Sequence, residues 1–116
     1  MAKFLVDLEV NVGGYEKSIH HLIEADTKQQ AMLQAMANES HSNANMDDTE
    51  NNEGVWWDLG GEFSYCVSSC KEVSDEVAKV LTDNCFHISQ YDPEYILEMI
   101  ADDAEIRDIE LLLKQL

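Results

Sequence analysis

Positive charge is scarce in this chain of 116 residues. It has 7 Lys and Arg against 24 Asp and Glu, which gives a formal net charge of −17. This imbalance argues against direct binding to nucleic acid or to anionic membrane, because both need basic residues at the contact. It also destabilises the compact state through self-repulsion. The favoured partner is therefore a cation or a basic surface on another protein.

Long apolar runs and an export signal are also missing. No hydrophobic stretch approaches the roughly 20 residues that a membrane span needs. The N-terminus leads directly into a short alternating run that contains Asp7 and Glu9, which does not resemble a signal peptide. The 3 cysteines are an odd number without disulfide-like spacing, so reduced thiols are the simplest interpretation. Together these features predict a cytoplasmic protein.

The chain lacks motifs for catalysis and for metal binding. Cys66 and Cys70 fall on one predicted strand, ~13 Å apart, which is too far for both to reach one tetrahedral ion. The acidic run at 47–54 lacks the spacing of an EF-hand. No Ser–His–acid arrangement, glycine-rich phosphate loop or nucleophile motif is present. We therefore expect no enzymatic activity, no metal and no cofactor, with a small hydrolase or metal-dependent enzyme as a less favoured reading.

The chain does contain enough apolar residues for one packed domain. Hydrophobic residues make up 45% of the sequence, which suffices to fill a core in a chain of this length. Phe4–Val10 alternates between apolar and polar residues, and so does Tyr15–Ala25 beyond the turn at Gly13-Gly14. This pattern predicts a β-hairpin with one buried face. On the second strand, the residues expected to point inward are Tyr15, Ile19, Ile23 and Ala25.

A helix is expected after this hairpin. Thr27 as N-cap with Gln30 three residues later forms a capping-box pattern, and Lys28–Asn38 is rich in helix formers. The expected buried stripe of this helix is Met32, Ala35 and Met36.

The same order of elements recurs further along the chain. Val55–Leu59 and Glu62–Cys70 surround Gly60-Gly61 and predict a second hairpin. Ser74 is the expected N-cap of a helix over Asp75–Asp83. The expected buried stripe of this second helix is Val77, Val80 and Leu81.

The C-terminal part is predicted to be helical. Asp92-Pro93-Glu94 is a strong helix start, with an N-cap residue followed by the only proline of the chain. A last helix is expected over Ala104–Gln115. The predicted fold is a single α+β domain over residues 1–116, in which two antiparallel β-hairpins form a small sheet with helices on one face and a helical C-terminus.

Negative charge is concentrated in two windows without Lys or Arg, which are Gln29–Cys70 and Val80–Ile106. Each window carries seven acidic residues. The first includes a stretch at 40–54 without periodicity, which predicts a long, mobile acidic loop. Solubility alone does not account for this segmentation.

We expect a partner-binding face made of carboxylates and an exposed aromatic ring. Carboxylates on a rigid scaffold would imitate nucleic-acid phosphates and attract a basic groove, while an aromatic side chain would slow dissociation. The expected partner-binding residues are Asp7, Glu9, Asp47, Asp48, Glu50, Glu53, Trp57, Asp58 and Glu62.

In composition and layout the chain resembles the small acidic anti-CRISPR and anti-restriction proteins of phages and mobile elements. The resemblance implies a non-enzymatic inhibitor that acts in the host cytoplasm and occupies a basic nucleic-acid-binding surface of a defence complex. Because the charge lies in two windows, a local acidic patch is expected rather than mimicry of a long duplex. The alternative is an intracellular regulatory or structural domain whose acidity serves solubility. The oligomeric state is left open.

Overall fold

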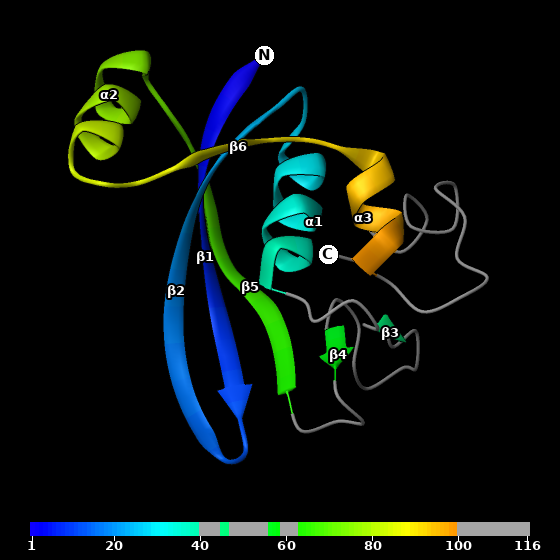
Figure 1. The fold of residues 1–116 in the computed structure, drawn as a ribbon. Coiled ribbons are helices and arrows are strands. Elements are labelled where there is room, and N and C mark those ends of the chain that lie inside the picture. Colours follow the sequence, from blue (N-terminus) through cyan, green and yellow to red (C-terminus); the bar gives the residue numbers. More distant parts are fainter. Residues whose placement is uncertain (40–44, 47–55, 59–62, 100–116) are drawn as a thin grey trace.

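Three long antiparallel strands form the centre of a six-stranded sheet in the computed structural model of the chain (Figure 1). The structure describes residues 1–39, 45–46, 56–58 and 63–99. The strand order is β3-β4-β5-β1-β2-β6, and only the pairing of β6 with β2 is parallel. The predicted α+β class is confirmed. The strands are β1 (Ala2–Val12), β2 (Tyr15–Ala25), β3 (Asn45–Met46), β4 (Trp56–Asp58), β5 (Phe63–Val73) and β6 (Ile88–Gln90).

The first predicted hairpin is confirmed along its whole length. Strands β1 and β2 pair from Ala2 opposite Ala25 to Val12 opposite Tyr15. Gly13 and Gly14 connect them with φ values of 55° and 94°. Positive φ at both central residues is the geometry of a type I′ turn, which matches the twist of the flanking strands and favours glycine.

The second predicted hairpin also forms, and it joins the same sheet. Strand β4 pairs with β5, with Asp58 opposite Phe63. Strand β5 then pairs with β1, and the register shifts between Asp7 and Leu8, so that Ser68 is the extra residue of a β-bulge. The short strand β3 lies inside the stretch at 40–54 that was predicted to be a loop. The rest of that stretch lies outside the described residues.

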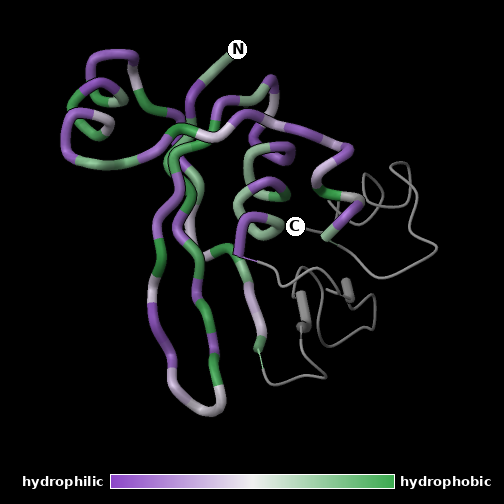
Figure 2. The backbone as a smooth tube through the Cα atoms, viewed as in Figure 1, coloured by the Kyte–Doolittle hydropathy of each residue, from purple (hydrophilic) through white to green (hydrophobic). Residues whose placement is uncertain are grey.

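The core fills the space between the sheet and helix α1 (Lys28–Glu39). Alternation along β1 places Phe4, Val6, Leu8 and Val10 inside, as predicted, and Figure 2 shows the alternating hydropathy along the hairpin. Helix α1 packs on β1, β2 and β5 and on helix α3 (Pro93–Met99). It is therefore buried continuously over Ala31–Ala37 rather than along the narrow predicted stripe alone.

The predicted helix caps are confirmed. Thr27 Oγ1 accepts a hydrogen bond from the Gln30 N–H at 3.2 Å, and Gln30 Oε1 accepts one from the Asp26 N–H at 3.1 Å. Asp92 caps α3 by accepting from the Tyr95 N–H at 3.3 Å. These local bonds satisfy backbone donors that have no partner within the helix.

Helix α2 (Asp75–Asp83) begins at the predicted N-cap, Ser74, but turns a different side toward the protein. Val77 and Val80 are 47% and 61% exposed, whereas Ala78 is 3% exposed, so the predicted buried stripe is wrong. Figure 1 shows α1 and α3 on one side of the sheet and α2 on the other, near the N-terminal end of β1. Asp75 pairs there with Lys3 at 2.7 Å, and the small Ala78 faces inward.

Two further predictions concern the orientation of Tyr15 and a last helix. Tyr15 was predicted to point inward but is 82% exposed, because it lies at the tip of the hairpin beyond the reach of α1. The predicted helix over Ala104–Gln115 lies outside the described residues.

We expect Leu8→Ala to lower the free energy of unfolding by about 2–5 kcal/mol, because it opens a cavity at a fully buried position of the central strand. Tyr15→Ala serves as the control and should change it by less than about 0.5 kcal/mol, because that side chain is exposed. Urea denaturation followed by circular dichroism measures both. Equal losses for the two variants would contradict the assignment of the core.

Candidate functional site on the outer face of the sheet

The outer face is the side of the sheet opposite α1, and it is built by the alternate residues of β5, β1 and β2. Cross-strand register arranges its side chains in rows, since directly paired residues share a face. Figure 1 shows α2 near one end of this face and no described helix over the end toward the hairpin tip. The three rows toward the tip are Ser69–Asp7–His20, Cys66–Glu9–Ser18 and Ser64–Asn11–Glu16.

Asp7 is the centre of the first row. His20 Nδ1 lies 2.5 Å from Asp7 Oδ1, and Ser69 Oγ donates to Asp7 Oδ2 at 2.6 Å. Burial opposes ionisation of Asp7, but the hydrogen bonds from Ser69 and His20 outweigh it, so the pKa of Asp7 is lowered. The carboxylate bridges the serine and the histidine. In a Ser–His–acid triad the histidine contacts the serine, so this row has the wrong order for nucleophilic catalysis.

At the end of the outer face beside α2, one lysine pairs with two carboxylates. Lys3 Nζ lies 2.7 Å from Asp75 Oδ1 and 3.7 Å from Glu24 Oε2. Glu24 also accepts a hydrogen bond from Gln90 Nε2 at 3.1 Å. The hydrogen bond with Lys3 lowers the pKa of Asp75, and the same bond raises the pKa of Lys3.

Uncompensated negative charge lies in the rows nearest the hairpin tip. Glu9 and Glu16 are exposed, and neither pairs with a basic side chain among the described residues. Burial raises the pKa of the Cys66 thiol beside Glu9, and the carboxylate raises it further. A thiol held in the protonated form is a poor nucleophile, and none of the three cysteines forms a disulfide.

The structure describes only some of the predicted partner-binding residues. Asp7 and Glu9 lie in adjacent rows of the outer face. Trp57 and Asp58 belong to β4, where their register positions are opposite Ser64 and Phe63 of β5. The other predicted residues, Asp47, Asp48, Glu50, Glu53 and Glu62, lie outside the described residues.

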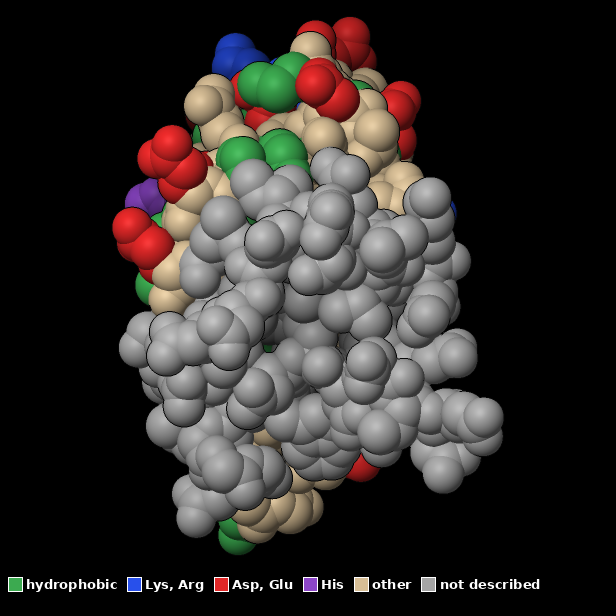
Figure 3. Space-filling view, turned by 90° about the vertical axis from the view of Figure 1, so that its right-hand side faces the viewer, with side chains coloured by type: hydrophobic (Ala, Val, Ile, Leu, Met, Phe, Trp, Pro, Cys, Tyr) green, Lys and Arg blue, Asp and Glu red, His purple; other side chains and the backbone are tan. Residues whose placement is uncertain are grey.

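The helical side of the molecule also carries carboxylates. Asp92, Glu94 and Glu98 are exposed at or within α3. Figure 3, viewed from that side, shows Asp and Glu side chains around the margin of the surface. These three residues belong to the second acidic window, so that window contributes surface charge.

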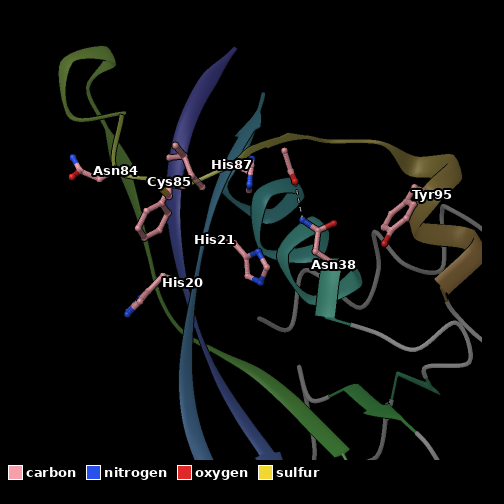
Figure 4. A pocket seen from close by; sticks show the side chains of 10 residues that line it. His20, His21, Asn38, Asn84, Cys85, His87 and Tyr95 are labelled. Atoms are coloured by element: carbon pink, nitrogen blue, oxygen red, sulfur yellow. Dashed lines mark hydrogen bonds between the residues drawn. The ribbon is translucent and has the colours of Figure 1, made fainter. Parts of the chain in front are cut away.

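An open cavity of about 550 Å³ lies at the edge of β2, where β6 begins to pair with it. Figure 4 shows His20 and Cys85 on one side of β2 and His21, Asn38 and Tyr95 on the other. His21 Nε2 lies 2.7 Å from Glu39 Oε1, and Asn38 Nδ2 donates to Ser89 Oγ at 3.0 Å. Within the described part of the chain, no three His, Cys, Asp or Glu residues are grouped to hold a metal ion.

Sequence reasoning missed this cavity, because its walls come from segments far apart in the chain. The local signals were the adjacent histidines of β2 and the Asn84-Cys85 pair. Cys85 has a φ of 74°, which turns the chain after α2. Only the parallel pairing of β6 with β2 brings the two segments together.

Comparisons with protein-family models, with characterised proteins and with solved structures find no match to this chain. None of the described helices is long and apolar enough to cross a membrane.

We expect stability at acidic pH to depend on Asp7. Because its folded-state pKa is below the ordinary 3.8, ionised Asp7 stabilises the fold above that pH, and the contribution is lost as pH falls through the folded pKa. Asp7→Asn should lower the free energy of unfolding at pH 7 by about 1–2 kcal/mol and flatten its fall as the pH drops below the ordinary carboxyl pKa of 3.8. Chemical denaturation at several pH values measures both effects.

Glu9→Gln, in the next row, is the matched control and should leave the stability and its pH dependence close to those of the parent protein. If Asp7→Asn and Glu9→Gln give the same pH profile, the Ser69–Asp7–His20 row does not contribute in this way.

Proposed function

We propose that this protein is a small acidic interaction protein that inhibits a host defence complex, of the anti-CRISPR or anti-restriction kind. It binds a basic nucleic-acid-binding surface of that complex and performs no catalysis of its own. Its site of action is the host cytoplasm. The observation that carries the proposal is the net charge of −17, concentrated in two windows without Lys or Arg.

The outer face supports this proposal through its unneutralised carboxylates. Glu9 and Glu16 project from rigid, paired strands near the tip of the β1–β2 hairpin. Carboxylates in such positions steer a basic surface toward the sheet and accelerate encounter. Asp7 has a different role, because its hydrogen bonds hold its own row in place, next to the row of Glu9.

Tyr15 provides the aromatic contact that a specific interface needs. It is 82% exposed at the hairpin tip and is the immediate neighbour of Glu16. Tyrosine is enriched among the residues that dominate binding energy, because it buries a large rigid area and keeps a polar end. Charge at Glu9 and Glu16 on the outer face thus raises the encounter rate, and the ring of Tyr15, on the opposite face of the same hairpin tip, prolongs the complex.

The competing hypothesis is a regulatory or structural domain whose acidity serves solubility. That hypothesis predicts that surface charge can be rearranged without loss of activity. Competition assays separate the two: purified CRISPR effector complexes and restriction enzymes are titrated with the protein, and their binding to nucleic acid is measured. If no member of such a panel is displaced from nucleic acid, the inhibitor hypothesis is wrong.

For a complex that is inhibited, we expect Glu9→Lys combined with Glu16→Lys to reduce the association rate at low salt by about tenfold or more. The double change should also weaken the salt dependence of binding, because two attractive charges become repulsive. Surface plasmon resonance at several salt concentrations measures the rates.

The matched control is Glu72→Lys with Glu76→Lys, which changes the net charge equally at exposed sites on β5 and α2, away from the hairpin tip. Equal effects of the two double variants would show that only total charge matters and that the tip of the outer face is not the contact.

A further inference from the structure

Among the described residues, no strand covers the outer edge of β2 along most of its length, and this part is called the open edge. The partner of β2 on that side, β6, pairs only with Leu22–Glu24. No described strand pairs with Tyr15–His21 on the side away from β1. Glu16, Lys17 and Ser18 are all exposed there. Such an edge is a template for an added strand, because its backbone N–H and C=O groups have no strand partner.

The positions whose backbone groups point outward follow from one hydrogen bond. The carbonyl of Glu24 accepts from the Tyr91 N–H at 2.9 Å, so the backbone of Glu24 faces the outer edge. Bonding direction alternates along a strand that is antiparallel to its neighbour. The outward-facing positions in the open part are therefore Glu16, Ser18 and His20.

The edge stays open because the chain turns away before β6. If β6 were extended toward the N-terminal end of β2, it would pass beside His20 and His21. Cys85, with its φ of 74°, directs the chain toward α2 instead. The cavity lined by His20, Leu22 and Cys85 lies at this departure point and leaves room for the end of an added strand.

We propose that the open edge of β2 binds an extended segment of the partner protein by antiparallel strand addition, and that this segment carries Lys or Arg at alternate positions. This inference rests on the proposed function and specifies its contact. Residues directly opposite each other in an antiparallel pair share a face and exchange hydrogen bonds. The partner residues opposite Glu16, Ser18 and His20 thus lie on the outer face.

Charge on the outer face selects basic residues at these alternate positions. A side chain opposite Ser18 lies two strand spacings, ~10 Å, from the position of Glu9 in β1. The small serine leaves the way to Glu9 open for a long Lys or Arg side chain. Glu16 contacts its own opposite residue directly, and the partner's intervening residues meet Lys17 and Ile19 on the other face.

A second copy of the chain is the other candidate for this edge, and charge disfavours it. Each copy carries a net charge of −17, so two copies repel each other as whole molecules, although the open part of β2 itself carries one acidic and one basic residue, Glu16 and Lys17. A basic strand gains attraction from the same charges.

The test uses a synthetic octapeptide of alternating lysine and valine, capped at both ends, titrated into the full-length protein and followed by amide NMR. We expect saturable shifts at the amides of Glu16, Ser18 and His20. Methylating the lysine backbone nitrogens should weaken binding by about tenfold or more, because those groups face β2. Methylating the valine backbone nitrogens keeps the charge of the peptide and its hydrogen bonds to β2. It should change the affinity by less than about twofold.

The matching protein variant is Ser18→Pro, which removes one outward-facing donor while keeping the bonds to β1. It should weaken binding of the unmodified peptide by about tenfold, whereas Ser18→Ala should not. The methylated peptides need no protein variant, so a folding defect in Ser18→Pro leaves the test decisive. Absence of saturable shifts at the three amides, or equal affinity of the two methylated peptides, would overturn the proposal.

Two further outcomes separate this inference from the function it rests on. If Ser18→Pro inhibits a defence complex as well as the parent while the Glu9 and Glu16 reversal does not, the inhibitor function stands and strand addition is wrong. A dimer seen by analytical ultracentrifugation that Ser18→Pro abolishes would assign the edge to a second copy and overturn the proposal as well.

Discussion

Burial of one face of β1 against α1 is the interaction on which the rest of the structure depends. Strand β1 is central, with β5 on one side and β2 on the other, and its even-numbered residues from Phe4 to Val10 are all buried. A chain with a net charge of −17 needs this apolar contact to offset the repulsion among its carboxylates. The strict alternation along β1 then sends Asp7 and Glu9 to the opposite face. The same pattern that builds the core therefore creates the acidic surface.

The bulge in β5 shows how the outer face is kept in register beside a charged residue. Ser68 is the extra residue, and its hydroxyl donates to the Asp7 carbonyl at 3.0 Å. Ser69 follows and donates to the Asp7 carboxylate. The residues at the bulge thus satisfy both the backbone and the side chain of Asp7, which offsets the desolvation that a partly buried carboxylate suffers. This local order fixes the row from which Glu9 and Glu16 extend.

Local patterns predicted the elements well, because each depends on neighbours in sequence. Alternation gave β1, the glycine pair gave the turn, and Ser74 and Asp92 gave the helix starts. The orientation of α2 could not be predicted in this way. Val77 and Val80 form a plausible apolar stripe, but the pairing of Asp75 with Lys3, 72 residues earlier in the chain, accompanies a different rotation in which Ala78 is buried.

The same limit applied to the candidate site. Glu9 could be placed on an exposed strand face from sequence, whereas the open edge and the cavity depend on where β6 joins the sheet. That position is set by a chain of hydrogen bonds through buried Gln34, which accepts from the Asp92 N–H and donates to Asn38, which in turn donates to Ser89. No local signal in the sequence indicates such a relay. Glutamine is usually exposed in folded proteins, but Gln34 is only 3% exposed.

The large negative charge and the open edge are best understood together. An exposed strand edge invites pairing with other copies, and proteins usually protect it with bulges, prolines or charged side chains. In β2 the open part carries only Lys17 and Glu16 as charged residues, but the whole molecule is strongly acidic. Screening at physiological salt acts over about 8 Å, which is more than one strand spacing of about 5 Å, so repulsion between charges on directly neighbouring strands remains effective at the contact. A basic segment meets no such barrier, and the charge that keeps copies apart attracts it. Acidity thus allows the edge to remain open while restricting which chains can use it.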